Sequence, residues 1–200
     1  MSVPAEISNL EEALRKLPGF GRRSASRAAL ALVREPLRLS APLSAALDAA
    51  ASRIRCCSRC GAYTTNDADP CPLCTDVLRD GNILCVVEEP SDIILLESAG
   101  AFRGRYHSLG GKLSPARHLG PDKLRFASLV DRVVREGFQE VLLALSTDME
   151  GDATAGYAME ALRGTGAKVT RLAFGLPADS GIAYSDPLTL KRAIQHRVEQ

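Results

Sequence analysis

The sequence predicts an α/β protein built from several modules: a small helical unit, a cysteine-rich finger and a mainly parallel βα domain. Three observations support this prediction. The first quarter of the chain carries apolar stripes with the helix period, two Cys-x-x-Cys pairs follow, and strand-like apolar runs then alternate with helix-like segments. The 200 residues, 46 % of them hydrophobic, are enough to bury one or two compact cores.

The helical unit is expected over residues 1–55 and should contain three short helices. Ser8 and Glu11 have the spacing of a capping box, which predicts that the first helix begins after Ser8. In the third helix, Leu43 and Leu47 share a face with alanines and are expected to point into a core. The predicted helices cover residues 9–17, 22–33 and 42–54.

Between the first two helices, the segment Leu17-Pro18-Gly19-Phe20-Gly21 predicts a tight turn. Gly19 and Gly21 would let backbone N–H groups face outward at the start of the second helix, where they can bind an anion. Arg23 and Arg27 are four residues apart on that helix, so one face can present both to phosphates. The alternative is an ordinary helix-packing corner with solvated arginines.

The charge distribution is consistent with phosphate binding by this first quarter. The chain has a net charge of +1, but residues 1–55 contain nine Lys/Arg against five Asp/Glu, and the remainder contains 16 against 19. The absence of tryptophan and the low aromatic content do not favour a base-stacking platform for single strands. We recognise no export signal and no membrane-spanning run, so a cytoplasmic protein without membrane contact is expected.

Cys57 and Cys60 form one Cys-x-x-Cys pair, and Cys71 and Cys74 form the other after a gap of ten residues. Four thiolates with this spacing are the ligand set of a closed, tetrahedral, structural zinc site with one zinc per chain. The finger is assigned to residues 56–78. Disulfides and redox chemistry are the alternatives, and a reducing cytosol disfavours the disulfides.

Two further cysteines fall outside this pattern. Cys56 could compete with Cys57 as a ligand, although its spacing to Cys60 is less usual. Cys85 lies within an apolar run at 83–87 and is expected to be a buried strand residue.

The βα domain is expected over residues 79–174, where four strand-like runs alternate with helical segments. This pattern is typical of a mainly parallel sheet covered on both faces. A final segment, 175–200, ends in a short helix near 188–197. The predicted strands cover residues 83–87, 105–109, 140–145 and 168–173, and the predicted helices cover 91–99, 123–136 and 152–163.

Acidic residues follow two of these strands. Glu88 comes directly after the first strand, and Asp148, Glu150 and Asp152 follow the third. Because the carboxyl ends of parallel strands meet at one edge of a sheet, these carboxylates could converge there and hold Mg²⁺ for phosphoryl transfer. The alternative is a set of acids that favour helix N-termini, which requires no function.

The order of these parts resembles the RecR family of bacterial recombination mediators over nearly the whole chain. The Leu-Pro-Gly-x-Gly turn is similar to a helix-hairpin-helix element, and the four-cysteine finger and several shorter fragments follow it in the family's order. Those fragments are residues 86–92, 104–111, 113–115, 150–155 and 184–190.

This resemblance implies a helix-hairpin-helix unit, a zinc finger, a Toprim domain and a C-terminal Walker-B-like or oligomerisation segment. It implies a non-enzymatic factor of recombinational DNA repair that forms a ring-like homotetramer and holds the DNA backbone without reading sequence. It also implies RecO and RecF as partners in loading RecA onto gapped DNA coated by single-strand-binding protein.

The resemblance also implies roles for particular positions. Arg23 and Arg27, together with Gly19 and Gly21, match the family's DNA-binding hairpin. The four cysteines match its zinc ligands. An acidic Toprim surface that binds partners rather than catalysing is matched by Glu88, Asp148, Glu150 and Asp152.

Two positions depart from related patterns. Toprim nucleases and topoisomerases carry an Asp-x-Asp motif, and Ser146 stands at its first position, so one metal-anchoring carboxylate is missing. Ala183 stands where a glutamate is usual in the Walker-B-like segment, and the chain contains no GxxxxGK[ST] loop. A Mg²⁺-dependent Toprim nuclease or primase-like enzyme is the alternative to a scaffold.

Overall fold

The computed structural model describes residues 3–173 and 187–195. The chain divides into two compact units, Met1–Ile54 and Arg55–Gln200. The finer boundaries at 55/56, 78/79 and 174/175 stay predictions, and Ala183 with its Walker-B-like surroundings lies outside the described residues. None of the helices in the described ranges combines the length and the apolar character that a membrane span requires.

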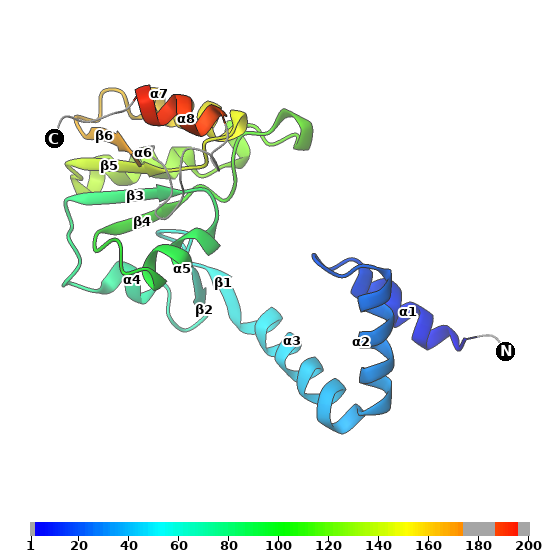
Figure 1. Cartoon of the computed structure of the whole chain (residues 1–200). Coiled ribbons are helices and arrows are strands. Elements are labelled where there is room, and N and C mark those ends of the chain that lie inside the picture. Colours follow the sequence, from blue (N-terminus) through cyan, green and yellow to red (C-terminus); the bar gives the residue numbers. More distant parts are fainter. Residues whose placement is uncertain (1–2, 174–186, 196–200) are drawn as a thin grey trace. The chain divides into compact units, whose positions relative to one another are not determined.

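The first unit is a helical hairpin that continues into a third helix (Figure 1). Ala25 and Ala29 are fully buried where the first two helices pack, because residues four apart share one helix face and their small side chains let the helices approach closely. Ser26 adds a hydrogen bond to Glu11 across the same interface. The elements are α1 (Ala5–Arg15), α2 (Arg22–Arg34), the π-helical turn η1 (Pro36–Ser40) and α3 (Ala41–Arg53).

Two expectations for this unit are wrong. The helix α1 begins after Pro4 and not after Ser8, because the Pro4 carbonyl already accepts hydrogen bonds from the N–H groups of Ile7 and Ser8. Leu43 and Leu47 do not point into a core, since every residue of α3 is exposed. The sequence correctly indicates an apolar stripe on α3, but no described residue of the first unit covers it.

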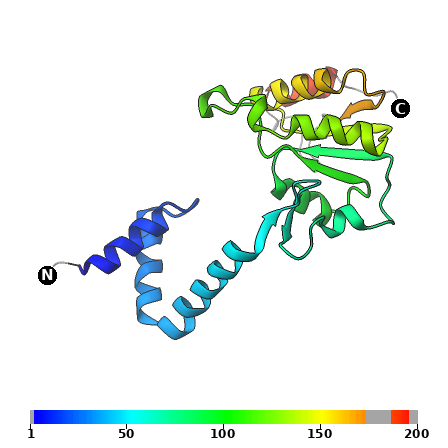
Figure 2. The ribbon, with the colours of Figure 1, turned by 180° about the vertical axis from the view of Figure 1, so that it is seen from behind.

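The second unit contains a four-stranded, entirely parallel sheet (Figures 1 and 2), which confirms the predicted α/β architecture. The strand order is β4–β3–β5–β6, so the winding direction reverses between β3 and β5. In such sheets, binding sites form beyond the carboxyl ends of the strands at the point of reversal. The strands are β3 (Ile83–Val87), β4 (Arg105–Ser108), β5 (Glu140–Ala144) and β6 (Lys168–Arg171).

Helices cover both faces of this sheet (Figure 2). The helix α5 (Pro90–Ser98) packs on one face, and α6 (Phe126–Glu136) and α7 (Met149–Leu162) pack on the other. The loop from β4 to α6 contains the short 3-10 turns η2 (Pro115–Arg117) and η3 (Pro121–Lys123). The predicted last helix is present as α8 (Pro187–Gln195).

The strand β3 is buried from both sides. Leu84 and Val86 pack into the cluster formed with α6 and α7, whereas Cys85 and Val87 pack into the cluster that contains Ile93 of α5. A parallel strand covered on both faces has a continuous apolar sequence, which is why this strand was easy to predict. Cys85 is buried there, as expected.

The four-cysteine segment contributes two very short strands, β1 (Ile54–Cys56) and β2 (Tyr63–Thr65), and one turn of helix, α4 (Pro72–Thr75). The strands pair with each other in a separate two-stranded sheet. Sequence reasoning did not predict these elements, because three or four residues are too few for a periodic apolar pattern.

Replacement of Leu129 tests this core. Leu129→Ala removes a fully buried side chain of α6, so we expect the free energy of unfolding to fall by about 2–5 kcal/mol. Val134 of the same helix is 62 % exposed, and Val134→Ala should change the free energy by no more than about 0.5 kcal/mol. Urea unfolding followed by circular dichroism measures both, and equal losses for the two variants would contradict the assigned core.

Candidate functional site

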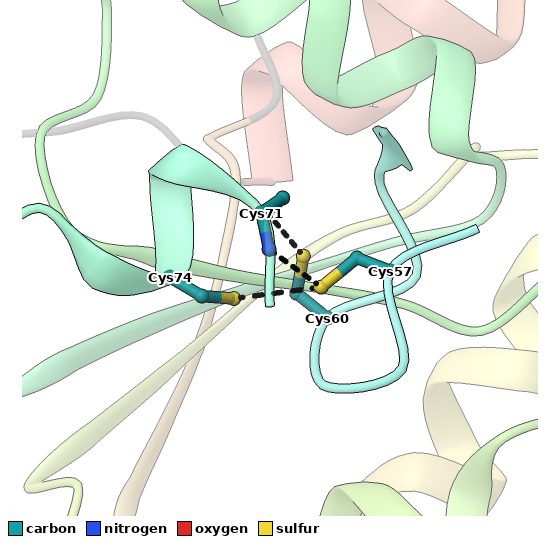
Figure 3. Close-up of side chains that lie close together, drawn as sticks. All are labelled: Cys57, Cys60, Cys71 and Cys74. Carbon is teal, nitrogen blue, oxygen red and sulfur yellow. Dashed lines mark hydrogen bonds between the residues drawn. The ribbon is translucent and has the colours of Figure 1, made fainter. Parts of the chain in front are cut away.

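The four predicted cysteines converge on one point in the second unit (Figure 3). Their Sγ atoms all lie within 4.8 Å of one another, and all four residues are buried. The Sγ–Sγ distance is 4.0 Å between Cys57 and Cys74 and 3.4 Å between Cys60 and Cys71. Sulfurs bound at about 2.3 Å to a tetrahedral zinc ion lie about 3.8 Å apart, so this cluster could hold such an ion.

Local backbone geometry explains why the cysteines of each pair point the same way. In the first loop, the N–H of Cys57 donates to the Ala62 carbonyl at 2.7 Å, and the N–H of Gly61 donates to the Cys57 carbonyl at 2.9 Å. Gly61 has φ +81°, a left-handed conformation that favours glycine. In the second loop, Cys71 is the N-cap of α4, so its side chain and that of Cys74 face the same point.

Backbone donors favour thiolates at this site. The N–H of Ala62 donates to Sγ of Cys60 at 3.4 Å. The N–H of Cys71 donates to Sγ of Cys57 at 3.3 Å (Figure 3). The hydrogen bond between Cys60 and Cys71 lowers the pKa of the Cys71 thiol and raises the pKa of the Cys60 thiol. Cys60 therefore stays protonated and donates to the Cys71 thiolate, and a bound cation would displace this proton.

The structure contains no disulfide, since all six cysteines are free. Redox chemistry stays an alternative for the two Cys-x-x-Cys pairs. Cys56 is exposed in β1 and does not belong to the cluster around Cys57. Within the described ranges, these four cysteines are also the only group of three or more His, Cys, Asp or Glu residues that could hold a metal ion.

The sheet's edge strand β4 lies beside this cysteine cluster. The N–H of Ser108 donates to the Cys60 carbonyl at 2.8 Å. His107 is fully buried, and its Nε2 donates to the Arg125 carbonyl at 3.1 Å. Burial, together with the charges of Arg125 and Arg132, lowers the pKa of His107 to about 3, so this histidine is neutral in the folded protein.

The hairpin of the first unit has the features of an anion site. Gly19 has φ +80°, and Gly21 is the N-cap of α2 without any side-chain cap. Arg22 and Arg23 follow in the first turn, which contains no acidic residue. Two cations at the positive end of a helix are unfavourable unless an anion binds there. Arg23 and Arg27 are both exposed, and sequence reasoning missed Arg22, whose signal was its place directly after the uncapped turn.

The acidic residues lie at the carboxyl edge of the sheet, where the winding reverses. Glu88 follows β3, and its Oε1 accepts a hydrogen bond from the N–H of Ser146 at 2.7 Å. Asp148 caps α7 by accepting from the N–H of Gly151 at 2.7 Å and forms an ion pair with Lys112. The bonds from Lys112 and from this N–H lower the pKa of Asp148 to about 2.

The other two acids also have cationic partners within the chain. Glu150 lies 3.5 Å from Arg117, and Asp152 lies 3.0 Å from Arg171. Among the described residues, the carboxylate oxygens do not gather into a group that could hold an ion. The acids thus share an edge, as expected, but three of them pair with basic side chains and Glu88 accepts from the N–H of Ser146, so they do not converge. Sequence reasoning missed Lys112, whose only signal was its position after two glycines.

Comparisons with known proteins agree with this arrangement. Residues 7–51 match the family model described as RecR, helix-hairpin-helix, and residues 82–173 match the model of the Toprim domain. A protein of Desulfatibacillum aliphaticivorans named Recombination protein RecR is 43 % identical over 97 % of this chain and 96 % of its own length. Proteins of the same name from Syntrophotalea carbinolica and Phenylobacterium zucineum are each 46 % identical, over 92 % and 98 % of this chain and 92 % and 97 % of their own lengths.

The buried His107 should make stability depend on pH. Its pKa of about 3 in the folded state is below the ordinary value near 6.5. The unfolded chain therefore binds the proton first, and stability present above pH 6.5 is lost as the pH falls. Between pH 7 and pH 5 we expect this residue alone to cost about 2 kcal/mol.

The measurement compares urea unfolding of the natural protein and of His107→Gln at pH 7 and pH 5. The side-chain amide of glutamine can take the place of Nε2 and donate to the Arg125 carbonyl, but it does not titrate in this range. The variant should therefore lose less stability on acidification than the natural protein. An identical pH dependence would show that His107 is not held neutral.

Proposed function

Because the chain belongs to the RecR family of recombination proteins, we propose that it is a DNA-binding mediator of recombinational repair that works as a scaffold and not as an enzyme. The observation that carries the DNA-binding part is the start of α2. There, Arg22 and Arg23 lie in the first turn of a helix whose N-terminus has no side-chain cap, and this turn contains no acidic residue. In this proposal the protein acts on DNA in the cytoplasm.

The chemistry of the hairpin suits the DNA backbone. Backbone N–H groups after Gly19 and Gly21 would donate to phosphate oxygens, and Arg23 and Arg27 would neutralise neighbouring phosphates from one face of the helix. Contacts of this kind hold DNA in place but carry no sequence information. Binding should therefore be independent of sequence and strongly dependent on salt.

We propose that several copies, four in the family's ring-like homotetramer, act together. Among the described residues of the first unit, two are completely buried and large apolar side chains are left in water, among them Leu37, which is 88 % exposed. The apolar stripe of α3, with Leu43 and Leu47, is likewise uncovered within the unit. Exposed apolar surface of this kind typically marks an interface between proteins. Each added hairpin would multiply the phosphate contacts, which strengthens binding without any new type of contact.

The ion that we propose for the cysteine cluster is zinc, one per chain, held by Cys57, Cys60, Cys71 and Cys74. Four thiolates complete its tetrahedral coordination, so the site leaves no position for a substrate or a reactive water. When bound, zinc would supply a cross-link between two loops that are too short to bury a core of their own.

We propose that the acidic Toprim surface, formed by Glu88, Asp148, Glu150 and Asp152, binds the partners RecO and RecF, and that the assembly helps to load RecA onto gapped DNA coated by single-strand-binding protein. The exposure of this edge supports the proposal, since Met149 beside Asp148 is 89 % exposed. A basic partner could exchange its own cations for Lys112 and Arg117 in the existing ion pairs.

The alternative function is a Mg²⁺-dependent Toprim nuclease or primase-like enzyme. Ser146 in place of a carboxylate and the pairing of Asp148 with Lys112 argue against it, because Mg²⁺ requires free carboxylate oxygens. We expect no nicking of supercoiled plasmid by the protein with Mg²⁺. Nicking that requires Mg²⁺ and disappears in Asp148→Ala would establish the enzyme and contradict the scaffold.

The hairpin is tested by reversing its charges. We expect Arg23→Glu with Arg27→Glu to weaken DNA binding at least tenfold at low salt for every sequence tested and to flatten the dependence of log K on log salt, because two phosphate contacts are lost. Gel shifts and fluorescence anisotropy over a salt series measure both effects. Arg135→Glu with Arg163→Glu makes the same charge change at two exposed positions of the second unit and should have much less effect. Equal losses of DNA affinity in the two double variants would show that only the net charge of the protein matters, and would contradict a specific role of the hairpin.

Native mass spectrometry tests the metal, the assembly and the partner together. We expect a tetramer with one zinc per chain that gains mass on addition of RecO. Cys57→Ser should lower the zinc content and release part of the assembly, because removal of one ligand opens the coordination sphere. A monomeric protein that binds DNA with full affinity would contradict the ring, and a protein that binds no zinc would contradict the zinc site.

A further inference from the structure

The first cysteine loop is held from outside by an arginine of the Toprim domain. Arg125 precedes α6, and its Nη2 donates to the carbonyls of Ser58 and Arg59 at 3.1 and 3.2 Å. Its Nη1 reaches the Cys57 carbonyl at 3.5 Å. A single guanidinium thus contacts three successive carbonyls of the Cys57–Cys60 loop, and hydrogen bonds from a charged donor are stronger than those from a neutral one.

The second cysteine loop is held in the same way by a different arginine. The Nη1 of Arg105, the first residue of β4, donates to the Leu73 carbonyl at 2.8 Å. Leu73 lies between Cys71 and Cys74 in α4, so this contact fixes the other half of the metal centre. Each Cys-x-x-Cys loop is therefore bound by one arginine of the Toprim domain.

The backbones of both arginines are held in place by hydrogen bonds within the Toprim domain. The carbonyl of Arg125 accepts a hydrogen bond from buried His107 at 3.1 Å, and its N–H donates to the Leu109 carbonyl at 3.0 Å. Arg105 is paired within the parallel sheet opposite Leu84 of β3. The positions of the two guanidinium groups are thus set by the fold of the Toprim domain, and not by the cysteine loops that they contact.

A partly buried ion-pair network adds a further connection to the first loop. Arg59 and Arg132 both bind the carboxylate of Glu136, each at 2.9 Å. Arg132 is only 2 % exposed and also donates to the Tyr106 carbonyl of β4 at 2.5 Å. The loop is therefore linked to α6 and to β4 through the same carboxylate.

Gly61 shows how closely the loop and its arginine fit. A Cβ atom at this position would lie 2.2 Å from Nη1 of Arg125 and 3.1 Å from Cβ of Ser108. An alanine here would push the guanidinium away from the carbonyls, in addition to the strain of φ +81°. The absence of a side chain at Gly61 is thus what allows Arg125 to reach the loop.

We infer that Arg125 and Arg105 are positioning residues of the metal centre, which hold the two cysteine loops so that the four sulfurs are assembled before a metal binds. This inference rests on the proposed zinc site. Because folding of the Toprim domain orders both loops, metal binding does not have to supply that ordering free energy, and the affinity rises accordingly. Loss of metal should then leave the loops in place.

Zinc affinity provides the first test. Arg125→Met and Arg105→Met keep the length of the side chain but remove its donors. Outer-shell partners of metal ligands contribute about 10–100-fold in affinity, and we expect a loss of this size for each variant, measured by competition with a chromophoric chelator. Arg135→Met, at an exposed position of α6, is the matched control and should bind zinc like the natural protein. An unchanged affinity in both test variants would overturn the inference.

Hydrogen exchange of the metal-free protein provides the second test and does not depend on zinc. After chelation, the amides of Gly61 and Cys74, which are hydrogen-bonded within the two loops, should stay protected in the natural protein. Arg125→Met should release Gly61 and spare Cys74, and Arg105→Met should do the reverse. Rapid exchange of both amides in the metal-free natural protein would overturn the inference. A failure to bind zinc at all would instead contradict the proposed function.

A double-mutant cycle tests whether Gly61 and Arg125 act through the same contact, and Arg125→Lys covers the case in which Arg125→Met folds poorly. Gly61→Ala should reduce zinc affinity partly by displacing the guanidinium, and this part should vanish when Arg125 is already methionine. The two losses should therefore be clearly less than additive. Arg125→Lys, which keeps the charge but has a single donor group, should lie between the natural protein and Arg125→Met. Full additivity, with Arg125→Lys equal to the natural protein, would rule out the contact as the cause.

Discussion

The hydrogen bond from the N–H of Ser108 to the carbonyl of Cys60 joins the parallel sheet to the four-cysteine segment, and each of these two parts supports the other. The strand β4 is an edge strand of the described sheet, so its outer backbone groups have no partner strand. The Cys60 carbonyl of the cysteine loop accepts a hydrogen bond from the N–H of Ser108, and Arg132 donates one to the carbonyl of Tyr106. The finger thus covers an edge that would otherwise be open to other chains, and the sheet supports a segment too short to fold on its own core.

The three candidate sites follow different physical rules. The hairpin relies on backbone N–H groups and on arginines that lack acidic partners in the first turn of α2. The cysteine cluster relies on four buried sulfur atoms, and Arg125 and Arg105 hold the two loops that carry them. At the acidic edge, three of the four carboxylates already pair with a cation of the same chain. The surfaces proposed to bind DNA, metal and partners thus lie on separate elements of one short chain.

Local patterns in the sequence predicted what depends on neighbours along the chain. The strands β3 and β5 were found because a doubly covered strand is apolar throughout, and the cysteine ligands were found from their spacing. The stripe of α3 was recognised but wrongly given a core, since a stripe does not say which surface covers it. Arg125 and Lys112 were missed because their partners, Ser58 and Asp148, lie 67 and 36 positions away. No periodic signal spans such a distance.

The ion pairs of the acidic edge affect how strongly partner binding at this edge would depend on the salt concentration. Lys112 and Arg117 neutralise Asp148 and Glu150 within the folded chain. A basic partner would therefore exchange one ammonium or guanidinium for another and would release few counterions from solution. Ionic strength should then have little effect on the affinity of a partner for this edge, whereas it strongly affects the affinity of the hairpin for a phosphate backbone. A single chain would thus have one surface that senses salt and one that is nearly indifferent to it.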